Sequence, residues 1–488
     1  MPEPSPGTSW PAVCSGNEPR SQDGHGIERL CSGPMTVPSP HPRRAARLEL
    51  ARALLGLAGL PLRLCWFALT RRRWKGRLAV HLDDPTPALE APPLPARVSF
   101  PERPLRICLS CGETSSAGHA ARVAEALRDV CREAGAAPPE LFGLGPTALT
   151  EAGVDCIADP TAAATMGGQG VFKEIPFYLD VMEAAAQSFA DRRPDAFVPV
   201  DAPALHLPLA RIARRYGVPT VHMVAPQYWA WGPWRAAAYR KTITRALTIF
   251  PWEPGWFADR AVPTAHVGHP QMDVLQAVEV TAPDAESRCE LVLLPGSRRG
   301  EVAVHLPWML RAAAPLASEV PGLKITVAQS GEELRPLIDD ILARSEVTAT
   351  LEVGDLHTTL CRARSALAAS GTVLTDLLHH RLPAVVIYAL RGGLRSRLVP
   401  ALLTTPFFST TNLLAGGELL PERGFRADVE GPLEEVSTLL RRAHLDAEWR
   451  TRCRNGLQRA AERIGPAGAA RRCAQHVLEV ALGSTQPL

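Results

Sequence analysis

From Leu105 onward, short apolar and β-branched runs alternate with segments of helical periodicity, and this alternation limits the chain to few folds. The first run, LRICLS at 105–110, precedes a helical pattern over Ala117–Ala134, and the rhythm restarts at 291–294 after a break at 274–288. Strands that alternate with helices of about ten to fifteen residues form βαβ units and parallel sheets. We therefore predict an α/β fold with two doubly wound domains facing a cleft. The other predicted strands are 196–200, 220–224, 247–250, 324–328, 366–369 and 384–388.

The chain of 488 residues is longer than an ordinary single domain, which has about 150 residues. Composition divides it further, because Pro, Ser and Gly dominate the first residues and no apolar period appears there. We predict, in order, a disordered leader at 1–42, a basic apolar segment at 43–80, a stiff Pro-rich linker at 81–104, doubly wound domains at 105–275 and 285–445, and C-terminal helices at 446–488.

The apolar stretch LELARALLGLAGLPLRLCWFALT covers 48–70 and is followed by the basic run RRRWKGR. Its apolar core is interrupted by Pro61 and Arg63 and is barely long enough to span a bilayer. A monotopic helix or re-entrant hairpin on an anionic leaflet fits this pattern, with Trp66 and Trp74 at the headgroups. A helix packed on the main domain is the alternative.

Charge and cysteine content exclude several classes of function. Residues 1–80 hold 12 Lys and Arg against 5 Asp and Glu, so the remainder of the chain is slightly acidic and is not expected to bind nucleic acid. The 11 cysteines form no paired framework, which favours reduced, intracellular thiols. Cys108 and Cys111 form a single C-x-x-C in an apolar run. We expect them to pack in the core and predict no metal site, because no second pair completes a zinc site.

The second half contains a strand, a tight turn and a helix in LLPGSRRGE, with the helix expected to begin near Glu301. Gly296 and Ser297 would let backbone N–H groups approach an anion, and the Arg298 guanidinium can bind phosphate oxygens in a forked geometry. An ordinary strand-to-helix turn would have the same pattern.

A second turn of this kind lies in AASGTVLTD, where Ser370, Gly371 and Thr372 follow a predicted strand. Asp376, one turn into the helix, could accept hydrogen bonds from ribose hydroxyls. The alternative is a helix capped by Ser370 or Thr372. Two such turns in one doubly wound domain favour a nucleotide diphosphate as the ligand.

The first half offers candidates for a general base. Asp201 directly follows the strand AFVPV, where a carboxylate could take a proton from an attacking hydroxyl group. A role as helix N-cap is equally open for Asp201. Glu113, Ser115 and His119 follow the first strand in SCGETSSAGHA, and His119 on an Ala-rich helix is more typical of a packing residue.

Tryptophan is concentrated in APQYWAWGPWR at 225–235 and in FPWEPGWF at 250–257. Trp229 and Trp231 could line an apolar acceptor channel. Both loops could equally brace a domain interface.

Together these motifs resemble the lipid-A-disaccharide synthases, glycosyltransferase family 19, over about residues 105–480. The resemblance rests on GETSSAGHA, PDAFVPVDAP, APQYWAW, FPWE, VGHP, LLPGSRRGE, ASGT-x-x-x-D and TTNLLAGGEL. It implies a GT-B fold of two Rossmann-like domains, N-terminal for the acceptor and C-terminal for the UDP-sugar, with C-terminal helices that cross back. The implied reaction joins UDP-2,3-diacylglucosamine to 2,3-diacylglucosamine 1-phosphate through a β-1,6 bond. UDP is released with inversion, and neither a metal nor a cofactor is required.

The resemblance also assigns residues by position. Asp201 becomes the general base on the acceptor hydroxyl, and Arg298 binds the UDP diphosphate. The other assigned residues are Glu113, Ser115 and His119 on the acceptor side, and Gly296, Ser297, Glu301, Ser370, Gly371, Thr372, Asp376 and Asn412 on the nucleotide side. The implied setting is cytoplasmic and peripheral, on the anionic inner face of a bacterial inner membrane, with a homodimer left open.

The chain departs from the family pattern at four positions. Ala117 and Ala204 replace aspartates, Asp376 replaces a glutamate and Ala389 replaces an arginine. The losses on the acceptor side leave two alternatives open. One is a GT-B enzyme that uses another lipid or sugar acceptor, and the other is a silent paralogue that binds nucleotide sugar or lipid without turnover.

Overall fold

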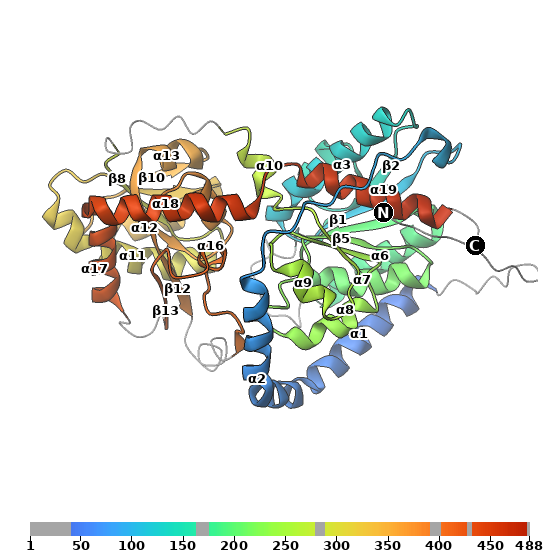
Figure 1. Ribbon diagram of the computed structural model, residues 1–488, viewed down its shortest axis with the longest axis horizontal. Coiled ribbons are helices and arrows are strands. Elements are labelled where there is room, and N and C mark those ends of the chain that lie inside the picture. The colour runs from blue at the N-terminus through green and yellow to red at the C-terminus, as the bar shows by residue number, and fades with distance from the viewer. Residues whose placement is uncertain (1–40, 163–174, 279–287, 391–401, 427–431, 486–488) are drawn as a thin grey trace, which may run out of the picture. The chain divides into compact units, whose positions relative to one another are not determined.

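The computed structural model describes residues 41–162, 175–278, 288–390, 402–426 and 432–485 (Figure 1). The predicted leader lies outside the described residues up to residue 40. The described chain contains two parallel sheets, each flanked by helices.

The first sheet has seven strands in the order β3-β2-β1-β4-β5-β6-β7. All of its pairings are parallel, and the order reverses direction between β1 and β4, as in other doubly wound sheets. Its strands are β1 (Arg106–Cys111), β2 (Glu140–Leu144), β3 (Asp155–Ala158), β4 (Ala196–Val200), β5 (Val221–Met223), β6 (Arg245–Thr248) and β7 (Thr264–His266). Its helices are α3 (Thr114–Glu133), α4 (Thr147–Glu151), α6 (Ile175–Arg192), α7 (Pro203–Arg215), α8 (Ala236–Arg240), α9 (Glu253–Ala258) and α10 (Gln271–Leu275).

The second sheet has six strands in the order β10-β9-β8-β11-β12-β13, again paired in parallel. Its strands are β8 (Glu290–Leu294), β9 (Ile325–Gln329), β10 (Thr350–Val353), β11 (Ala363–Ala369), β12 (Ala384–Leu390) and β13 (Glu422–Arg426). Its helices are α11 (Arg299–Glu319), α12 (Arg335–Ala343), α13 (Leu356–Arg362), α14 (Val373–His379), α16 (Thr410–Ala415) and α17 (Leu433–Leu445). The predicted α/β class with two doubly wound sheets is confirmed.

Apolar patterning explains which elements form. Every residue of β4 and β8 is buried, and apart from Glu290 at the start of β8 both strands are apolar runs, as expected for parallel strands covered on both faces. Helix α3 buries residues at the three- and four-residue spacing of one helical face. Those buried residues are Ala117, Ala120, Val123, Ala124, Leu127, Val130 and Cys131. Cys108 and Cys111 are buried in β1, which confirms that they pack in the core.

The C-terminal helices α18 (Ala447–Ile464) and α19 (Ala469–Thr485) pack on different sheets. Helix α18 contacts α14 and α16, whereas α19 contacts α3, β4 and β5 of the first sheet (Figure 1). The Asp273 carboxylate caps α19 by accepting the backbone N–H groups of Gly468, Ala469 and Ala470 at 2.5, 3.0 and 2.8 Å. The second half of the chain is thereby tied to the first sheet through α19.

The basic apolar segment forms two helices, α1 (Pro42–Ala58) and α2 (Leu60–Leu82), with the break at Gly59. In the described part of the chain, no single helix combines the length and apolar composition for crossing a membrane. Helices α1 and α2 pass that test only as a pair bent by 52°. One face of the pair packs on the first sheet's helices, since the buried Glu49 carboxylate accepts from Arg211 at 2.5 Å and from Arg215 at 2.7 Å. On this face, the helix pair therefore packs on the main domain, which was the alternative to membrane contact.

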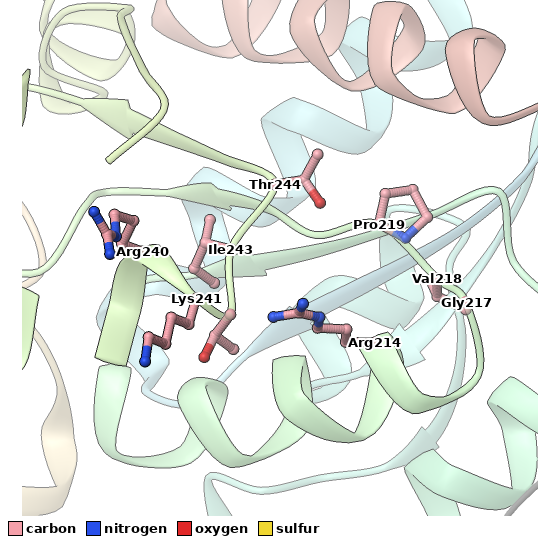
Figure 2. A pocket seen from close by; sticks show the side chains of 9 residues that line it. Arg214, Gly217, Val218, Pro219, Arg240, Lys241, Ile243 and Thr244 are labelled. Carbon is pink, nitrogen blue, oxygen red and sulfur yellow. The ribbon is translucent and has the colours of Figure 1, made fainter. Parts of the chain in front are cut away.

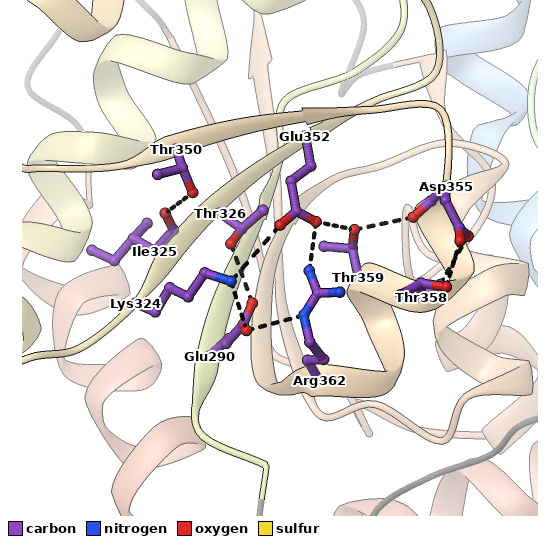
Figure 3. A network of polar contacts seen from close by, with 10 residues as sticks. All are labelled: Glu290, Lys324, Ile325, Thr326, Thr350, Glu352, Asp355, Thr358, Thr359 and Arg362. Atoms are coloured by element: carbon purple, nitrogen blue, oxygen red, sulfur yellow. Dashed lines mark hydrogen bonds and ion pairs between the residues drawn. The ribbon is translucent and has the colours of Figure 1, made fainter.

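At the amino end of β8, a partly buried ion network joins three strands to α13 (Figure 3). The Glu290 carboxylate accepts from Lys324 and Arg362, each at 3.0 Å. Glu352 accepts from Arg362 at 2.5 Å and from Thr359 at 2.7 Å. Because only 5% of Glu290 is exposed, losing a cationic partner would leave its charge poorly compensated.

We expect Arg362→Met to lower the free energy of unfolding by roughly 1–3 kcal/mol, between the values for exposed and fully buried ion pairs. The control is Arg344→Met, which removes the exposed pair with Asp340 and should cost below about 0.5 kcal/mol. Urea denaturation of both variants measures the difference. Equal losses would show that the network contributes no more than a surface pair.

Candidate functional site

Most of the residues predicted for the site follow the carboxyl ends of four parallel strands. Glu113 and His119 follow β1, and Asp201 follows β4. The turn containing Arg298 follows β8, and the turn at Ser370–Thr372 follows β11. Ligands of doubly wound sheets bind at this edge of the strands.

Arg298 connects the turn after β8 to the turn after β1. Its guanidinium donates from Nη2 to Glu113 Oε2 and from Nη1 to Glu301 Oε1, both at 3.0 Å. All three side chains are at least one third exposed, so the charges remain accessible to a ligand. The structure thus brings together Glu113, Arg298 and Glu301.

The Asp201 carboxylate is electrostatically coupled to the same group of residues. Burial raises the pKa of Asp201, and the negative charge of Glu113 raises it further, while the Ala202 N–H and the Arg298 charge act in the opposite direction. A raised carboxyl pKa is a frequent property of residues that exchange protons with a substrate. Among the described residues, Ala202 occupies the N-cap of α7 without any side-chain cap bond, so Asp201 is not the helix cap.

The backbone at this point is unusual, because Asp201 has φ +55° and Ala202 has φ +45°. Residues other than glycine adopt this left-handed conformation at a cost of about 1–3 kcal/mol, and such residues concentrate at functional sites. Gly112 permits the close approach of the neighbouring turn, since a Cβ atom there would lie 2.6 Å from the Ala202 Cβ.

His119 is half-buried in α3, and its Nδ1 has no hydrogen-bond partner among the described residues. Burial lowers the pKa of His119 to about 4, and the Arg122 charge adds to this effect. The imidazole is therefore neutral at pH 7. Ser115 belongs to α3, but its side chain lies outside the described part of the structure.

On the nucleotide side, both predicted turns present an exposed backbone. Gly296 has φ +111°, and a Cβ there would lie 2.6 Å from Glu301 Oε2, so the turn after β8 requires glycine. Ser297, Gly371 and Thr372 are exposed. Thr372 occupies the N-cap of α14 without a side-chain cap bond in the described structure, so the capping alternative is not realised there.

The Asp376 carboxylate, predicted to accept hydrogen bonds from ribose hydroxyls, already has a partner within the protein. It is buried, and its carboxylate accepts from Gln271 Nε2 of α10 at 3.0 Å. Burial raises the pKa of Asp376 to about 6, against the effect of the Gln271 hydrogen bond. Asp376 therefore links α14 to α10, through a partner that the sequence analysis missed.

Asn412 is fully buried, and its side chain makes several hydrogen bonds within the protein. Its Nδ2 donates to the Leu420 carbonyl at 2.8 Å and to Glu422 Oε2 at 3.1 Å. Its Oδ1 accepts the N–H groups of Leu419 at 3.0 Å and of Leu420 at 2.8 Å. The side chain fixes the loop between α16 and β13. The nucleotide contact predicted for Asn412 stays a prediction.

Trp229 is also buried, and its predicted place in an acceptor channel stays a prediction. Its Nε1 donates to the buried Glu253 carboxylate at 2.8 Å, and burial raises the pKa of Glu253 to about 7. Trp231 is 44% exposed, with the Arg235 guanidinium 4.2 Å from its ring centroid, and it pairs with Leu403. The burial of Trp229 fits the alternative that its loop braces a domain interface. The Trp231 ring remains accessible to solvent.

A cavity of about 470 Å³ lies at the opposite, amino-terminal edge of β5 and β6 (Figure 2). Its lining includes Arg214, Arg240 and Lys241, whose side chains extend from α7 and from the end of α8. None of the predicted site residues lines it.

We expect Asn412→Ala to lower the free energy of unfolding by at least about 2 kcal/mol, because the buried N–H and carbonyl groups of Leu420 lose the Asn412 side chain as their partner. Asn455→Ala, at an exposed position of α18, is the control and should change stability by less than about 0.5 kcal/mol. Thermal and urea unfolding measure both variants. Matching unfolding midpoints would rule out the structural role assigned to Asn412.

The sequence of this chain is similar to a known protein family and to individual members of it. The sequence model described as lipid-A-disaccharide synthetase matches residues 107–444. The lipid-A-disaccharide synthase of Myxococcus xanthus is 33% identical over 398 residues, which cover 77% of this chain and 98% of the relative. The synthase of Azotobacter vinelandii is 32% identical, with the same coverage of both chains.

Two solved structures support the fold alone. An S. aureus MnaA-UDP co-structure aligns with a TM-score of 0.53 at 13% identity, covering 75% of this chain and 94% of that one. The UDP-GlcNAc 2-epimerase of Neisseria meningitidis, bound to UDP-GlcNAc, aligns with a TM-score of 0.50 at 12% identity, covering 78% and 100%. With the sequence match over 107–444, the chain belongs to the lipid-A-disaccharide synthetase family.

Proposed function

We propose that this protein is an inverting glycosyltransferase that forms the lipid A disaccharide. It transfers 2,3-diacylglucosamine from UDP-2,3-diacylglucosamine to 2,3-diacylglucosamine 1-phosphate, giving the β-1,6 disaccharide 1-phosphate and UDP. The observation that carries this proposal is the cluster of Asp201, Glu113 and Arg298 at the carboxyl ends of the strands in a member of this family. A silent paralogue is less favoured, because it has no need of an acid–cation cluster at that position.

In the proposed reaction, the acceptor O6 attacks the donor C1 while the bond from C1 to the UDP phosphate oxygen breaks. The Asp201 carboxylate takes the hydroxyl proton, and UDP leaves with the bonding electron pair. Arg298 and the N–H groups of the turns after β8 and β11 stabilise the charge on the leaving diphosphate. For this step Arg298 would exchange a carboxylate partner for phosphate oxygens.

Glu113 has a separate effect on the proposed base. Its negative charge, added to burial, holds the pKa of Asp201 above the usual value. Because a base must be ionised to accept a proton, activity should fall as the pH decreases through this raised pKa. The raised pKa also makes the carboxylate a stronger proton acceptor at neutral pH.

Asp201→Asn keeps the side-chain size but cannot accept a proton, so we expect kcat to fall at least about 10²-fold. The dissociation constant of UDP and the melting temperature should stay close to the parent values. Asp340→Asn on the exposed surface of α12 is the control and should retain full turnover. Near-parental turnover of Asp201→Asn would assign the base to another residue, with Glu113 as the nearest candidate.

Arg298→Ala should raise the dissociation constant of UDP at least about tenfold, since a charge-assisted hydrogen bond contributes roughly 1.5–3 kcal/mol. Arg344→Ala, which removes a remote exposed guanidinium, should leave the constant unchanged. Isothermal titration with UDP measures both. Parental UDP affinity in a folded Arg298→Ala protein would remove Arg298 from the donor site.

We also propose that α1 and α2 bind an anionic membrane surface, which would place the enzyme peripherally on the cytoplasmic face of the inner membrane beside its lipid substrates. The outer side of this helix pair exposes large apolar side chains, while Glu49 and Phe67 anchor the opposite side in the protein. The exposed apolar residues of the pair are Leu48, Leu54, Leu55, Leu57, Leu60, Leu62, Trp66, Leu69 and Val80.

Basic side chains on the same helices complement this apolar surface. Arg72, Arg73, Lys75 and Arg77 are exposed along α2, where they could contact anionic headgroups. Apolar insertion combined with electrostatic attraction is the usual basis of peripheral helix binding. A homodimer, the other predicted partner, stays a prediction that equilibrium sedimentation can test.

We expect the combined change of Leu55, Leu62 and Leu69 to Ser to weaken binding to phosphatidylglycerol vesicles by roughly 100-fold or more, because each buried Leu contributes about 1.5–3 kcal/mol. The matched control changes Val98 and Leu445, exposed apolar residues outside the pair, to Ser. High salt should weaken binding of the parent only in part. If the triple variant sediments with vesicles as the control does, the membrane contact lies elsewhere in the chain.

A further inference from the structure

The backbone carbonyl of Asp201 is held by two buried histidines on different elements. His206 of α7 approaches it through Nδ1 at 2.5 Å, and His222 of β5 approaches it through Nε2 at 3.0 Å. Both imidazoles are fully buried, with no exposed surface in the described structure. Neither histidine has a part in the reaction as described above.

The protons of this group can be assigned from its chemistry. A carbonyl oxygen only accepts hydrogen bonds, so Nδ1 of His206 and Nε2 of His222 must each carry a proton. Burial lowers the pKa of His206 to about 3 and that of His222 to about 4, so each ring is neutral and has one proton at pH 7.

The remaining ring nitrogens must then accept hydrogen bonds from hydroxyl groups. Ser110 Oγ lies 2.9 Å from Nε2 of His206, and Tyr239 Oη lies 3.1 Å from Nδ1 of His222. Both hydroxyls donate in this arrangement. The two histidines are therefore held in opposite tautomers, each fixed by a hydroxyl on one side and by the same carbonyl on the other.

The carbonyl that they bind belongs to the strained residue. Asp201 and Ala202 both have positive φ, and such strain persists only where surrounding contacts fix the backbone. The Asp201 N–H is also held, by the Met223 carbonyl at 2.9 Å. With both its N–H and its carbonyl bound, Asp201 has little freedom to rotate its backbone, which fixes the starting direction of its side chain.

We propose that His206 and His222 are positioning residues, whose two N–H donors keep Asp201 in the left-handed conformation from which its carboxylate takes the acceptor proton. This inference rests on the proposed function of Asp201 as the general base. The histidines neither touch substrate nor transfer protons in it. Their effect is on the geometry of the proton transfer, which a displacement of about 1 Å can slow by 10²-fold.

Side-chain amides provide matched substitutions. The Asn amide nitrogen lies close to the position of histidine Nδ1, and the Gln amide nitrogen lies close to that of Nε2. His206→Asn and His222→Gln therefore keep a donor toward the carbonyl, whereas His206→Leu and His222→Leu remove it. His444→Leu is the control, because His444 is a buried histidine bonded to Ser365 Oγ at 2.9 Å in the second sheet's domain.

For each folded variant we expect kcat to fall at least about tenfold in the two Leu substitutions and to return to within about threefold of the parent in the Asn and Gln substitutions. KM for the UDP-sugar should change less than about twofold, because the nucleotide turns belong to the other sheet. His444→Leu should lose stability but retain the parental kcat. Unchanged kcat in the Leu variants, or equal losses in the amide and Leu variants, would overturn the inference.

A second readout does not depend on activity. Nitrogen-15 NMR of labelled histidine should show Nδ1–H in His206 and Nε2–H in His222 at neutral pH, and identical tautomers or charged rings would overturn the inference. Turnover retained in Asp201→Asn would overturn the role of Asp201 as general base and this inference with it. Turnover retained in His206→Leu, with Asp201→Asn inactive, would overturn this inference alone.

Discussion

The parallel register of the central strands is the constraint on which the candidate site depends. In the first sheet Cys111 pairs with Val200, so the turns with Glu113 and Asp201 leave the sheet side by side. In the second sheet Leu294 pairs with Ala368, which brings the turn at Gly296 next to the turn at Ser370. A shift of one residue in either register would reverse the side chains of a strand between the faces of the sheet. The chemistry therefore depends on the apolar strands that set this register.

Burial then determines the properties of the charged groups at these strand ends. Asp201 is removed from solvent enough to raise its pKa, whereas Arg298 keeps an exposed guanidinium that two carboxylates share. Asp201 is therefore suited to take a proton, and Arg298 is suited to bind an anion. Two neutral histidines bind the backbone carbonyl of Asp201. They fix its backbone without adding a further charge near the proposed base.

The sequence predicted the central strands well, because strands such as β4 and β8 are continuous apolar runs. It missed β2, β3, β7, β10 and β13. Four of these strands are short or polar, as in ERGFR of β13, whereas β2 is a mostly buried strand of five residues. Motif spacing placed Glu113, Arg298 and Asp201 at strand ends. It could not show that Asp376 and Asn412 turn into the protein, because burial depends on tertiary packing. The roles of His206 and His222 were also hidden, since only the fold brings α7 and β5 to one carbonyl.

In the proposed reaction, the cluster at the strand ends joins two acylated glucosamines and releases UDP. Mass spectrometry of the products that the purified, full-length protein forms from UDP-2,3-diacylglucosamine and 2,3-diacylglucosamine 1-phosphate tests it most directly. We expect a tetraacyl disaccharide 1-phosphate together with UDP in equal amounts. UDP release without disaccharide, or no UDP release with these substrates, would contradict it.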